Sequence, residues 1–162
     1  MGEQGIHFCF MRIYKKSKWV RVHSNVEVEP EVAWKVLTEP ELIQKYMFNC
    51  QFHSNWEVGS DAIWKEQIED GSFVNRVTAK ILIYDPLNRI SFQVYHKREN
   101  QEPDTTELIF RITPVVNGIY LDIVQGNFDY VSNGEKLFEE CEAKWDLVLP
   151  KLVEVCYKIN GT

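Results

Sequence analysis

The hydrophobic residues between Glu135 and Lys158 repeat with the spacing of an amphipathic α-helix. On a helical wheel of 3.6 residues per turn they share one arc of about 120°, the width of a stripe that faces a core. Leu147 and Val153 lie outside the arc with the charged residues. The spacing therefore predicts a long C-terminal helix whose apolar face consists of Leu137, Phe138, Cys141, Trp145, Val148, Leu149, Leu152, Val155, Cys156 and Ile159.

The segment from Trp19 to Val28 alternates instead between valines and polar residues. A period of two predicts a β-strand that is buried on one face. Tight turns are predicted at Asp70-Gly71 and Asn117-Gly118, which are typical hairpin sequences. The same alternation predicts further strands over residues 48–53, 62–68, 73–84, 90–96, 108–112 and 119–127, with a polar loop over 98–104. A short strand is also predicted from Ile6 to Tyr14, although its pattern is mixed.

Two short helices are predicted between the first clear strand and the remaining strands. Pro30 suits the first position of a helix, because its missing N–H has no intrahelical partner there. A second start is predicted at Thr38, where the side chain of Thr38 would cap the helix and Glu41 would bond back to it. The apolar faces of the two helices are Val32, Ala33, Val36 and Leu37, and then Leu42, Ile43, Tyr46 and Met47.

These elements predict an α+β helix-grip fold. In that fold, a curved antiparallel sheet of about six to seven strands wraps round the long C-terminal helix. The C-terminal helix is the only predicted element long enough to cover the apolar face of such a sheet. A length of 162 residues suits one domain, so we expect residues 1–162 to form a single unit with its core over about 19–159.

Composition narrows the classes of function. The hydrophobic content of 44 % and the charged content of 26 % are typical of a soluble globular protein. The net charge of −6 argues against nucleic-acid binding, which requires a basic surface. The basic cluster of Arg12, Lys15, Lys16, Lys18 and Arg21 is interpreted as a solvated segment, with an anionic-partner patch as the alternative.

The cysteines and the hydropathy of the sequence indicate where in the cell the protein is expected. None of Cys9, Cys50, Cys141 and Cys156 forms a C-x-x-C pair, and two of them lie on the apolar stripe of the C-terminal helix. Reduced core thiols are therefore the better interpretation, which favours a cytoplasmic location. The sequence has no apolar run of about 18 residues, so membrane insertion is not expected. No signal peptide is apparent.

The sequence contains no motif for a nucleophile elbow, a zinc protease, a phosphate-binding loop or a dinucleotide site. The four histidines are scattered along the chain. Neither a metal site nor a cofactor is therefore expected, and no catalytic residue is assigned.

Four polar residues fall on rows that otherwise face the predicted core: Glu66, Asn75, His96 and Gln125. One interpretation places them near strand ends, or paired with backbone groups. The other places them in a cavity, where they orient the polar end of a ligand. A Glu66–His96 pair acting as acid and base is a third possibility.

Six aromatic residues have two interpretations as well, as core or as pocket walls: Trp34, Trp64, Phe92, Phe110, Phe128 and Trp145. The five other than Phe128 are the cavity candidates. Together with the polar residues and one leucine of the C-terminal helix, they make up the predicted ligand-binding set: Trp34, Trp64, Glu66, Asn75, Phe92, His96, Phe110, Gln125, Trp145 and Leu149.

The segment Val28–Leu42 resembles the opening of START-like proteins, which include lipid-transfer domains, plant pathogenesis-related proteins and polyketide cyclases. Within that superfamily it is most similar to the family named for the activator of the heat-shock chaperone ATPase. The similarity rests on Ala33-Trp34, on Leu37-Thr38-Glu39-Pro40-Glu41 and on the turn Trp56-Glu57-Val58-Gly59-Ser60. It covers about Trp19 to Ile159.

The resemblance implies a deep apolar cavity between the sheet and the helix, but it does not imply one activity. The first hypothesis is a non-enzymatic protein that binds a small hydrophobic molecule, such as a lipid or an aromatic compound. The alternatives are an enzyme of the polyketide cyclase or hydrolase kind and a chaperone-interaction module. A protein partner or a homodimer is possible in each case.

Overall fold

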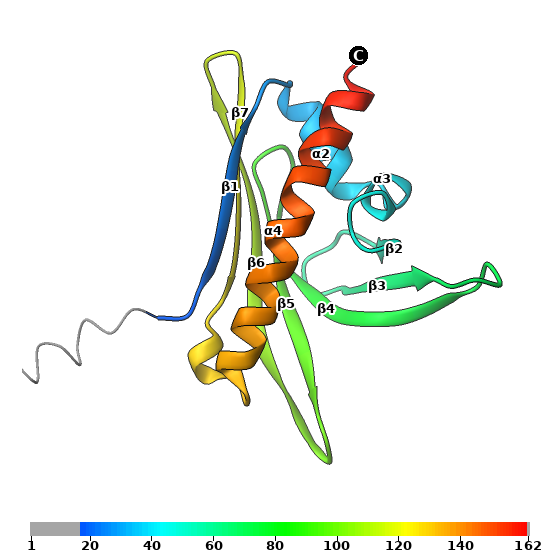
Figure 1. The fold of residues 1–162 in the computed structure, drawn as a ribbon, viewed down its shortest axis with the longest axis vertical. Helices are drawn as coiled ribbons and strands as arrows, with labels where there is room; N and C mark the ends of the chain where they lie inside the picture. The colour runs from blue at the N-terminus through cyan, green and yellow to red at the C-terminus, as the bar shows by residue number, and fades with distance from the viewer. Residues whose placement is uncertain (1–16, 162) are drawn as a thin grey trace, which may run out of the picture.

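The computed structural model describes residues 17–161, and the predicted strand from Ile6 to Tyr14 lies outside this range. The described residues form seven strands, three α-helices and one 3-10 helix (Figure 1). In chain order the elements are β1 (Val20–Val26), α2 (Pro30–Thr38), α3 (Pro40–Gln44), β2 (Cys50–Ser54), β3 (Asp61–Gln67), β4 (Phe73–Asp85), β5 (Arg89–Arg98), β6 (Gln101–Val115), β7 (Gly118–Gly126), η1 (Phe128–Tyr130) and α4 (Gly134–Ile159).

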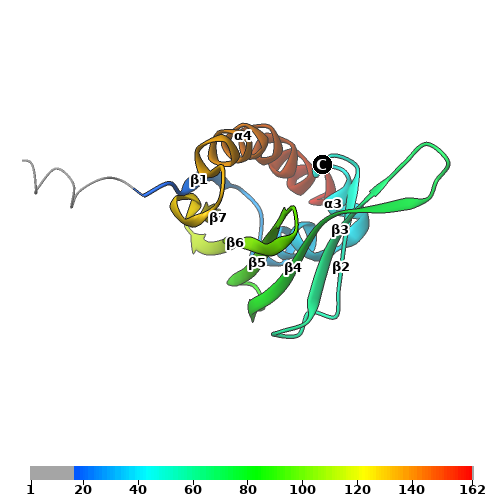
Figure 2. The same ribbon diagram turned by 90° about the horizontal axis from the view of Figure 1, so that it is seen from below.

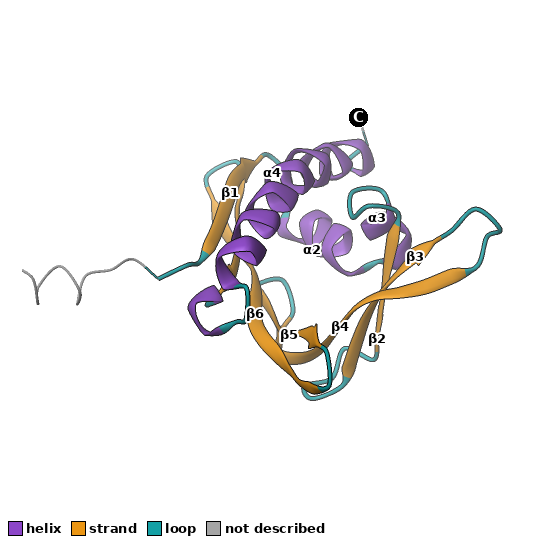
Figure 3. Cartoon of the chain, turned by 60° about the horizontal axis from the view of Figure 1, so that its bottom comes forward, coloured by secondary structure: helices purple, strands orange, loops and turns teal. Residues whose placement is uncertain are grey.

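All seven strands belong to one antiparallel sheet in the order β1-β7-β6-β5-β4-β3-β2. The sheet curls, and α4 lies within its concave side (Figure 2). Strands β1 and β2 form the two edges, because α2 and α3 carry the chain from one edge to the other (Figure 3). This arrangement confirms the predicted α+β helix-grip fold.

Two β-bulges in β4 contribute to the curvature of the sheet. Trp64 pairs with Val77, but the next residue of β3 pairs with Asn75, so Arg76 is an extra residue. A second irregularity leaves Leu82 as the extra residue between β4 and β5. Each extra residue bends its strand and increases the local twist. It also reverses which face the following side chains occupy, because side chains alternate along a strand.

The bulges make part of the prediction for β4 wrong. Simple alternation predicted that Phe73, Asn75 and Ile83 face the core. Because of the bulges, all three lie on the outer face of the sheet, and Phe73 is 40 % exposed. Tyr84 takes the inward position near the end of β4 and packs against Trp34, with 5.6 Å between the ring centroids.

Several predictions at element ends are also wrong. Thr38 does not cap α3: Glu39 occupies that position, and the Thr38 hydroxyl donates to the Trp34 carbonyl at 2.8 Å. By residue type, Ser132 or Asn133 is predicted to cap α4 with its side chain; Asn133 occupies the N-cap position but makes no such hydrogen bond. The predicted loop over 98–104 is instead a tight hairpin, because β5 and β6 continue until only Glu99 and Asn100 separate them.

A hairpin forms at the predicted place, but its two turn residues are Val116 and Asn117, and Gly118 begins β7. Close packing against β1 gives the reason for this glycine. A Cβ atom on Gly118 would lie 2.3 Å from the carbonyl oxygen of Val26. No other residue fits without moving the end of β1, which pairs with β7 here. Asn117 adopts the left-handed conformation with φ of 65°, which asparagine tolerates better than most residues.

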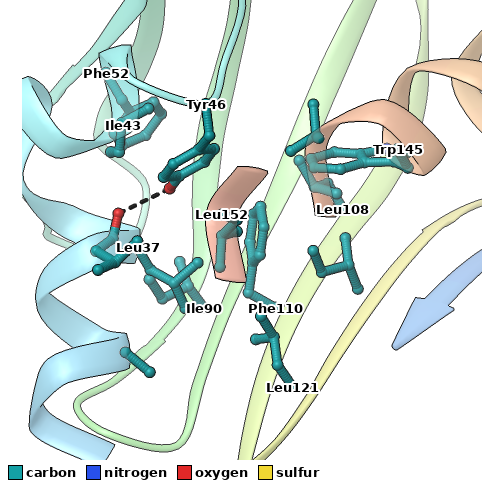
Figure 4. Close-up of a cluster of buried hydrophobic side chains, with 14 of the residues drawn as sticks. Leu37, Ile43, Tyr46, Phe52, Ile90, Leu108, Phe110, Leu121, Trp145 and Leu152 are labelled. Atoms are coloured by element: carbon teal, nitrogen blue, oxygen red, sulfur yellow. Dashed lines mark hydrogen bonds between the residues drawn. The ribbon is translucent and has the colours of Figure 1, made fainter. Parts of the chain in front are cut away.

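The predicted stripe of α4 faces the sheet. Trp145, Val148 and Leu152 are buried, with Leu152 fully inaccessible, whereas Leu147 on the opposite side is 57 % exposed. These side chains join the inner faces of the strands in one core (Figure 4). Each large apolar side chain buried in this way contributes about 1.5–3 kcal/mol relative to an exposed position.

The short helices close one end of the core. Tyr46, just after α3, is buried, and its hydroxyl donates to the Val36 carbonyl at 2.8 Å (Figure 4). Burial raises the pKa of Tyr46 well above its ordinary value. The hydroxyl therefore stays protonated and holds the segment after α3 against α2.

Candidate functional site

An unbroken series of aromatic side chains crosses the inner face of the sheet to α4. Phe52, Trp64, Phe92, Phe110 and Trp145 contact one another in that order, with centroid distances of 4.5, 5.5, 6.0 and 5.7 Å. We call these five residues the aromatic row. Four of them belong to the predicted set. Phe52 was left out of that set, although its alternation already pointed inward.

Trp34 reaches the aromatic row only through other rings. It is partly buried on α2 and contacts Tyr84, which contacts Trp56 at 5.5 Å. Trp56 in turn lies 5.0 Å from Phe52. The structure therefore places Trp34 at the margin of the aromatic cluster.

Beside Trp145, a hydrogen-bonded series of polar side chains leads away from the aromatic row. Trp145 Nε1 donates to Gln125 Oε1 at 2.9 Å, and Gln125 Nε2 donates to Thr106 Oγ1 at 3.0 Å. Thr106 Oγ1 lies 2.8 Å from His96 Nε2. We call these four residues the polar network. It joins three residues of the predicted set from β5, β7 and α4.

Thr106 is the member of the polar network that the sequence reasoning missed. It alternates inward with Leu108 and Phe110 on β6, and it is only 3 % exposed. The predicted strand began at Leu108, so Thr106 fell outside it. Extending the alternation by one residue pair toward the N-terminus would have included it.

The strand register brings the polar network together. Val94 pairs with Thr106 between β5 and β6, and Leu108 pairs with Gln125 between β6 and β7. Directly paired residues share a face, so His96, Thr106 and Gln125 project toward α4. Thr106, Gln125 and Trp145 are all buried. Burial of these polar groups is tolerated because each is hydrogen-bonded.

His96 is the titratable member of the polar network. It is half-buried, and burial lowers its pKa; the carboxylate of Asp104 raises that pKa and Lys144 lowers it further. Asp104 itself accepts from the Ser132 N–H at 2.8 Å and from Arg98 at 3.3 Å. The Ser132 N–H is the largest influence that holds the pKa of Asp104 below its usual range. His96 is therefore neutral at neutral pH.

The lowered pKa of His96 predicts a pH-dependent stability. Protonation favours the unfolded chain, where the pKa is about 6.5, so the folded state loses stability as the pH falls below that value. The loss stops once the pH passes below the pKa of His96 in the folded state. Urea unfolding at pH 7.5 and pH 5.5 should show a larger loss for the wild type than for His96→Gln.

The exposed His53 provides the control for this experiment. His53→Gln should keep the pH dependence of the wild type. Asp104 also loses stabilising interactions in acid, but its lowered pKa places that loss below the pH range used. Equal pH dependence in the wild type and His96→Gln would contradict the assigned burial of His96.

Glu66 lies apart from the polar network. It pairs with Arg76, whose Nε lies 2.5 Å from Glu66 Oε2, and it is opposite Cys50 on β2. Burial raises the pKa of Cys50, and the Glu66 carboxylate raises it further. No hydrogen bond or ion pair joins Glu66 to His96 among residues 17–161, so the structure does not form the hypothetical acid–base pair.

The other two members of the predicted set differ in position. Asn75 is exposed on the outer face of β4, because the bulge at Arg76 turns it away from the core. The prediction that it points inward is wrong. Leu149 is partly buried on α4 and packs against the core from its margin.

The described cysteines Cys50, Cys141 and Cys156 are free thiols. Burial raises the pKa of Cys156 to about 11, so it is protonated and unreactive at neutral pH. Within residues 17–161, no three His, Cys, Asp or Glu side chains come together as metal ligands. Measured by length and hydropathy, no helix in this range is suited to crossing a bilayer.

A separate hollow of about 670 Å³ opens on the surface beside the β2–β3 turn. Its lining is mainly polar and contains no residue of the predicted ligand-binding set. It is formed by His53, Ser54, Asn55, Gly59, Ser60, Asp61 and Lys80.

Comparisons with solved structures confirm the architecture. ChR145 from Cytophaga hutchinsonii has a TM-score of 0.69 and 20 % identity, over 91 % of this chain and 100 % of its own. MLL2253 from Mesorhizobium loti has a TM-score of 0.68 and 18 % identity, over 86 % of this chain and 97 % of its own. The Aha1 dimer from Colwellia psychrerythraea has a TM-score of 0.65 and 18 % identity, over 89 % of this chain and 98 % of its own.

These identities are low, so the solved structures establish the fold alone. None of the curated proteins compared with the sequence matched it. The family described as activator of Hsp90 ATPase homolog 1-like protein matches residues 27–156, which is most of the chain. The chain therefore belongs to the activator of Hsp90 ATPase homolog 1-like protein family.

Proposed function

We propose that the protein binds a small, mostly apolar molecule between α4 and the inner face of the sheet, without reacting with it. The observation that carries this proposal is the junction of the aromatic row with the polar network at Trp145. Ligand sites are mostly apolar and contain a few well-placed polar groups that fix orientation. The junction combines these two features, and no charged side chain belongs to it.

The N-terminal half of α4 supplies the margin through which a ligand would reach the polar network. Phe128 lies 6.1 Å from His96 and 6.1 Å from Phe138, measured between ring centroids. Phe138 and Cys141 are only partly buried, although both belong to the apolar stripe. An apolar molecule would gain from covering these side chains, which supports a path beside Phe138.

Binding is better supported than catalysis. Catalysis by a paired acid and base would need two proton-transferring groups within reach of the same substrate. Glu66 is held by Arg76 instead, and Asp104 is held by Ser132 and Arg98. The other residues of the polar network are uncharged. His96 is therefore better suited to orienting a ligand than to transferring a proton.

The fluorescent aromatic ketone Prodan is a suitable probe of this proposal. We expect saturable binding of one probe per chain, with a blue shift of its emission. Phe138→Glu should weaken binding at least tenfold, because it places a charge on the apolar path. The control Leu147→Glu changes the exposed side of the same helix and should leave the affinity unchanged.

Two results would contradict the proposal. One is the absence of saturable Prodan binding to the wild type. The other is an equal loss of affinity in Phe138→Glu and Leu147→Glu, because that would indicate general damage to α4. Circular dichroism of both variants checks that the helix is retained.

A further inference from the structure

We infer that His96 donates a hydrogen bond from Nδ1 to the carbonyl oxygen of an uncharged apolar ligand, with its proton held on Nδ1 by the polar network. This inference rests on the proposed function and adds the chemical class of the ligand. It depends on the direction of each hydrogen bond between Trp145 and His96.

Trp145 determines the orientation of the Gln125 amide. The indole N–H is a donor only, so its partner at 2.9 Å must be the amide oxygen. The Gln125 NH₂ group then faces Thr106, where it donates to Oγ1 at 3.0 Å. The reverse orientation would bring two donors together at Trp145.

The Thr106 hydroxyl determines which nitrogen of His96 carries the proton. It accepts from Gln125, so its own single proton needs an acceptor. Among the described residues, the only other partner of Thr106 Oγ1 is His96 Nε2 at 2.8 Å. His96 Nε2 therefore accepts, and the proton of the neutral imidazole resides on Nδ1.

The Nδ1–H group of His96 has no acceptor among the described residues. The second N–H of Gln125 has none either, since Gln125 donates only to Thr106. His96 is half-buried beside Phe128, so its ring is reachable from the apolar margin. The site thus offers two donors without partners among residues 17–161, which favours a ligand with an acceptor oxygen.

The charged side chains close to His96 favour an uncharged ligand. Asp104 pairs with His96 across β5 and β6 and shares its face of the sheet. Its carboxylate would repel an anionic ligand. A cationic ligand would be repelled by Arg98, which pairs with Asp104, and by Lys144, whose charge also acts on His96. A ketone, ester or amide oxygen satisfies both conditions.

The first test measures the proton position without any ligand. Long-range ¹H–¹⁵N spectra of histidine-labelled protein at pH 7.5 distinguish the two neutral tautomers, and His96→Gln identifies the signals of His96. We expect Nδ1 to be the protonated nitrogen. Thr106→Val should shift His96 toward the Nε2–H tautomer, and Thr106→Ser should keep the wild-type spectrum. Protonation at Nε2 in the wild type would overturn the inference.

The second test compares 2-acetylnaphthalene with 2-ethylnaphthalene, which lacks the carbonyl, as competitors of Prodan. The ketone should bind about fivefold more tightly, the typical net advantage of one hydrogen bond. This advantage should disappear in His96→Leu. Equal binding of the two compounds to the wild type would overturn the donor role while the proposed function stands. Failure of both compounds to bind would overturn the proposed function and the ligand class together.

Discussion

Leu152→Ala is expected to lower the free energy of unfolding by about 2–5 kcal/mol. Leu152 is fully inaccessible at the centre of the face of α4 that packs in the core. The substitution removes buried methyl groups and leaves a cavity, because the surrounding strands relax only partly. Alanine is the better helix former, so the loss would come from packing and not from helix propensity. Urea unfolding monitored by tryptophan fluorescence measures it.

Leu147→Ala is the matched control for Leu152→Ala. It removes the same atoms from the same helix, but Leu147 is 57 % exposed. Its effect should stay within about 0.5 kcal/mol, as for most surface substitutions. If the two variants were destabilised equally, the assignment of the buried face of α4 would be wrong.

Gln125→Leu is expected to lower the free energy of unfolding by about 1–3 kcal/mol. Leucine is similar in size and adds apolar surface, but it leaves the buried N–H of Trp145 without an acceptor and removes one of the two partners of the Thr106 hydroxyl. An unsatisfied buried polar group loses its hydrogen bonds to water without replacement. Gln93→Leu, on the outer face of β5, removes only a long hydrogen bond that Gln93 accepts from the Tyr95 hydroxyl at 3.4 Å, so it should cost less than Gln125→Leu.

A double-mutant cycle isolates the bond between Gln125 and Trp145. Trp145→Phe removes the donor and leaves the Gln125 oxygen unpaired. The double variant removes both partners, so its loss should be smaller than the sum of the single losses by about 0.5–3 kcal/mol. Additive losses would show that this hydrogen bond does not contribute to stability.

The sequence predicted much of the core correctly because burial repeats with the period of each element. Trp145, Val148 and Leu152 follow the helical period, and Trp64 and Phe92 follow the strand period; all five are buried. The helix-grip fold follows from the same patterns, since a long one-sided helix and an antiparallel sheet each need an apolar partner.

The prediction from periodicity failed in β4, where two bulges interrupt the alternation of side chains between the faces of the sheet. The extra residues Arg76 and Leu82 turn Asn75 and Ile83 outward, although the sequence on either side continues to alternate. A bulge depends on how two strands pair, and this pairing is set by contacts between distant residues. Local periodicity does not contain that information.

The sequence alone determined which segments become helices and strands and which side chains most of them bury, because these properties depend on neighbouring residues. It also made His96, Gln125 and Trp145 candidates for a site. Only the tertiary structure decided that they meet through Thr106 and that Glu66 stays apart. These residues come from three strands and a helix, and the strand register and the packing of α4 bring their side chains within hydrogen-bonding distance.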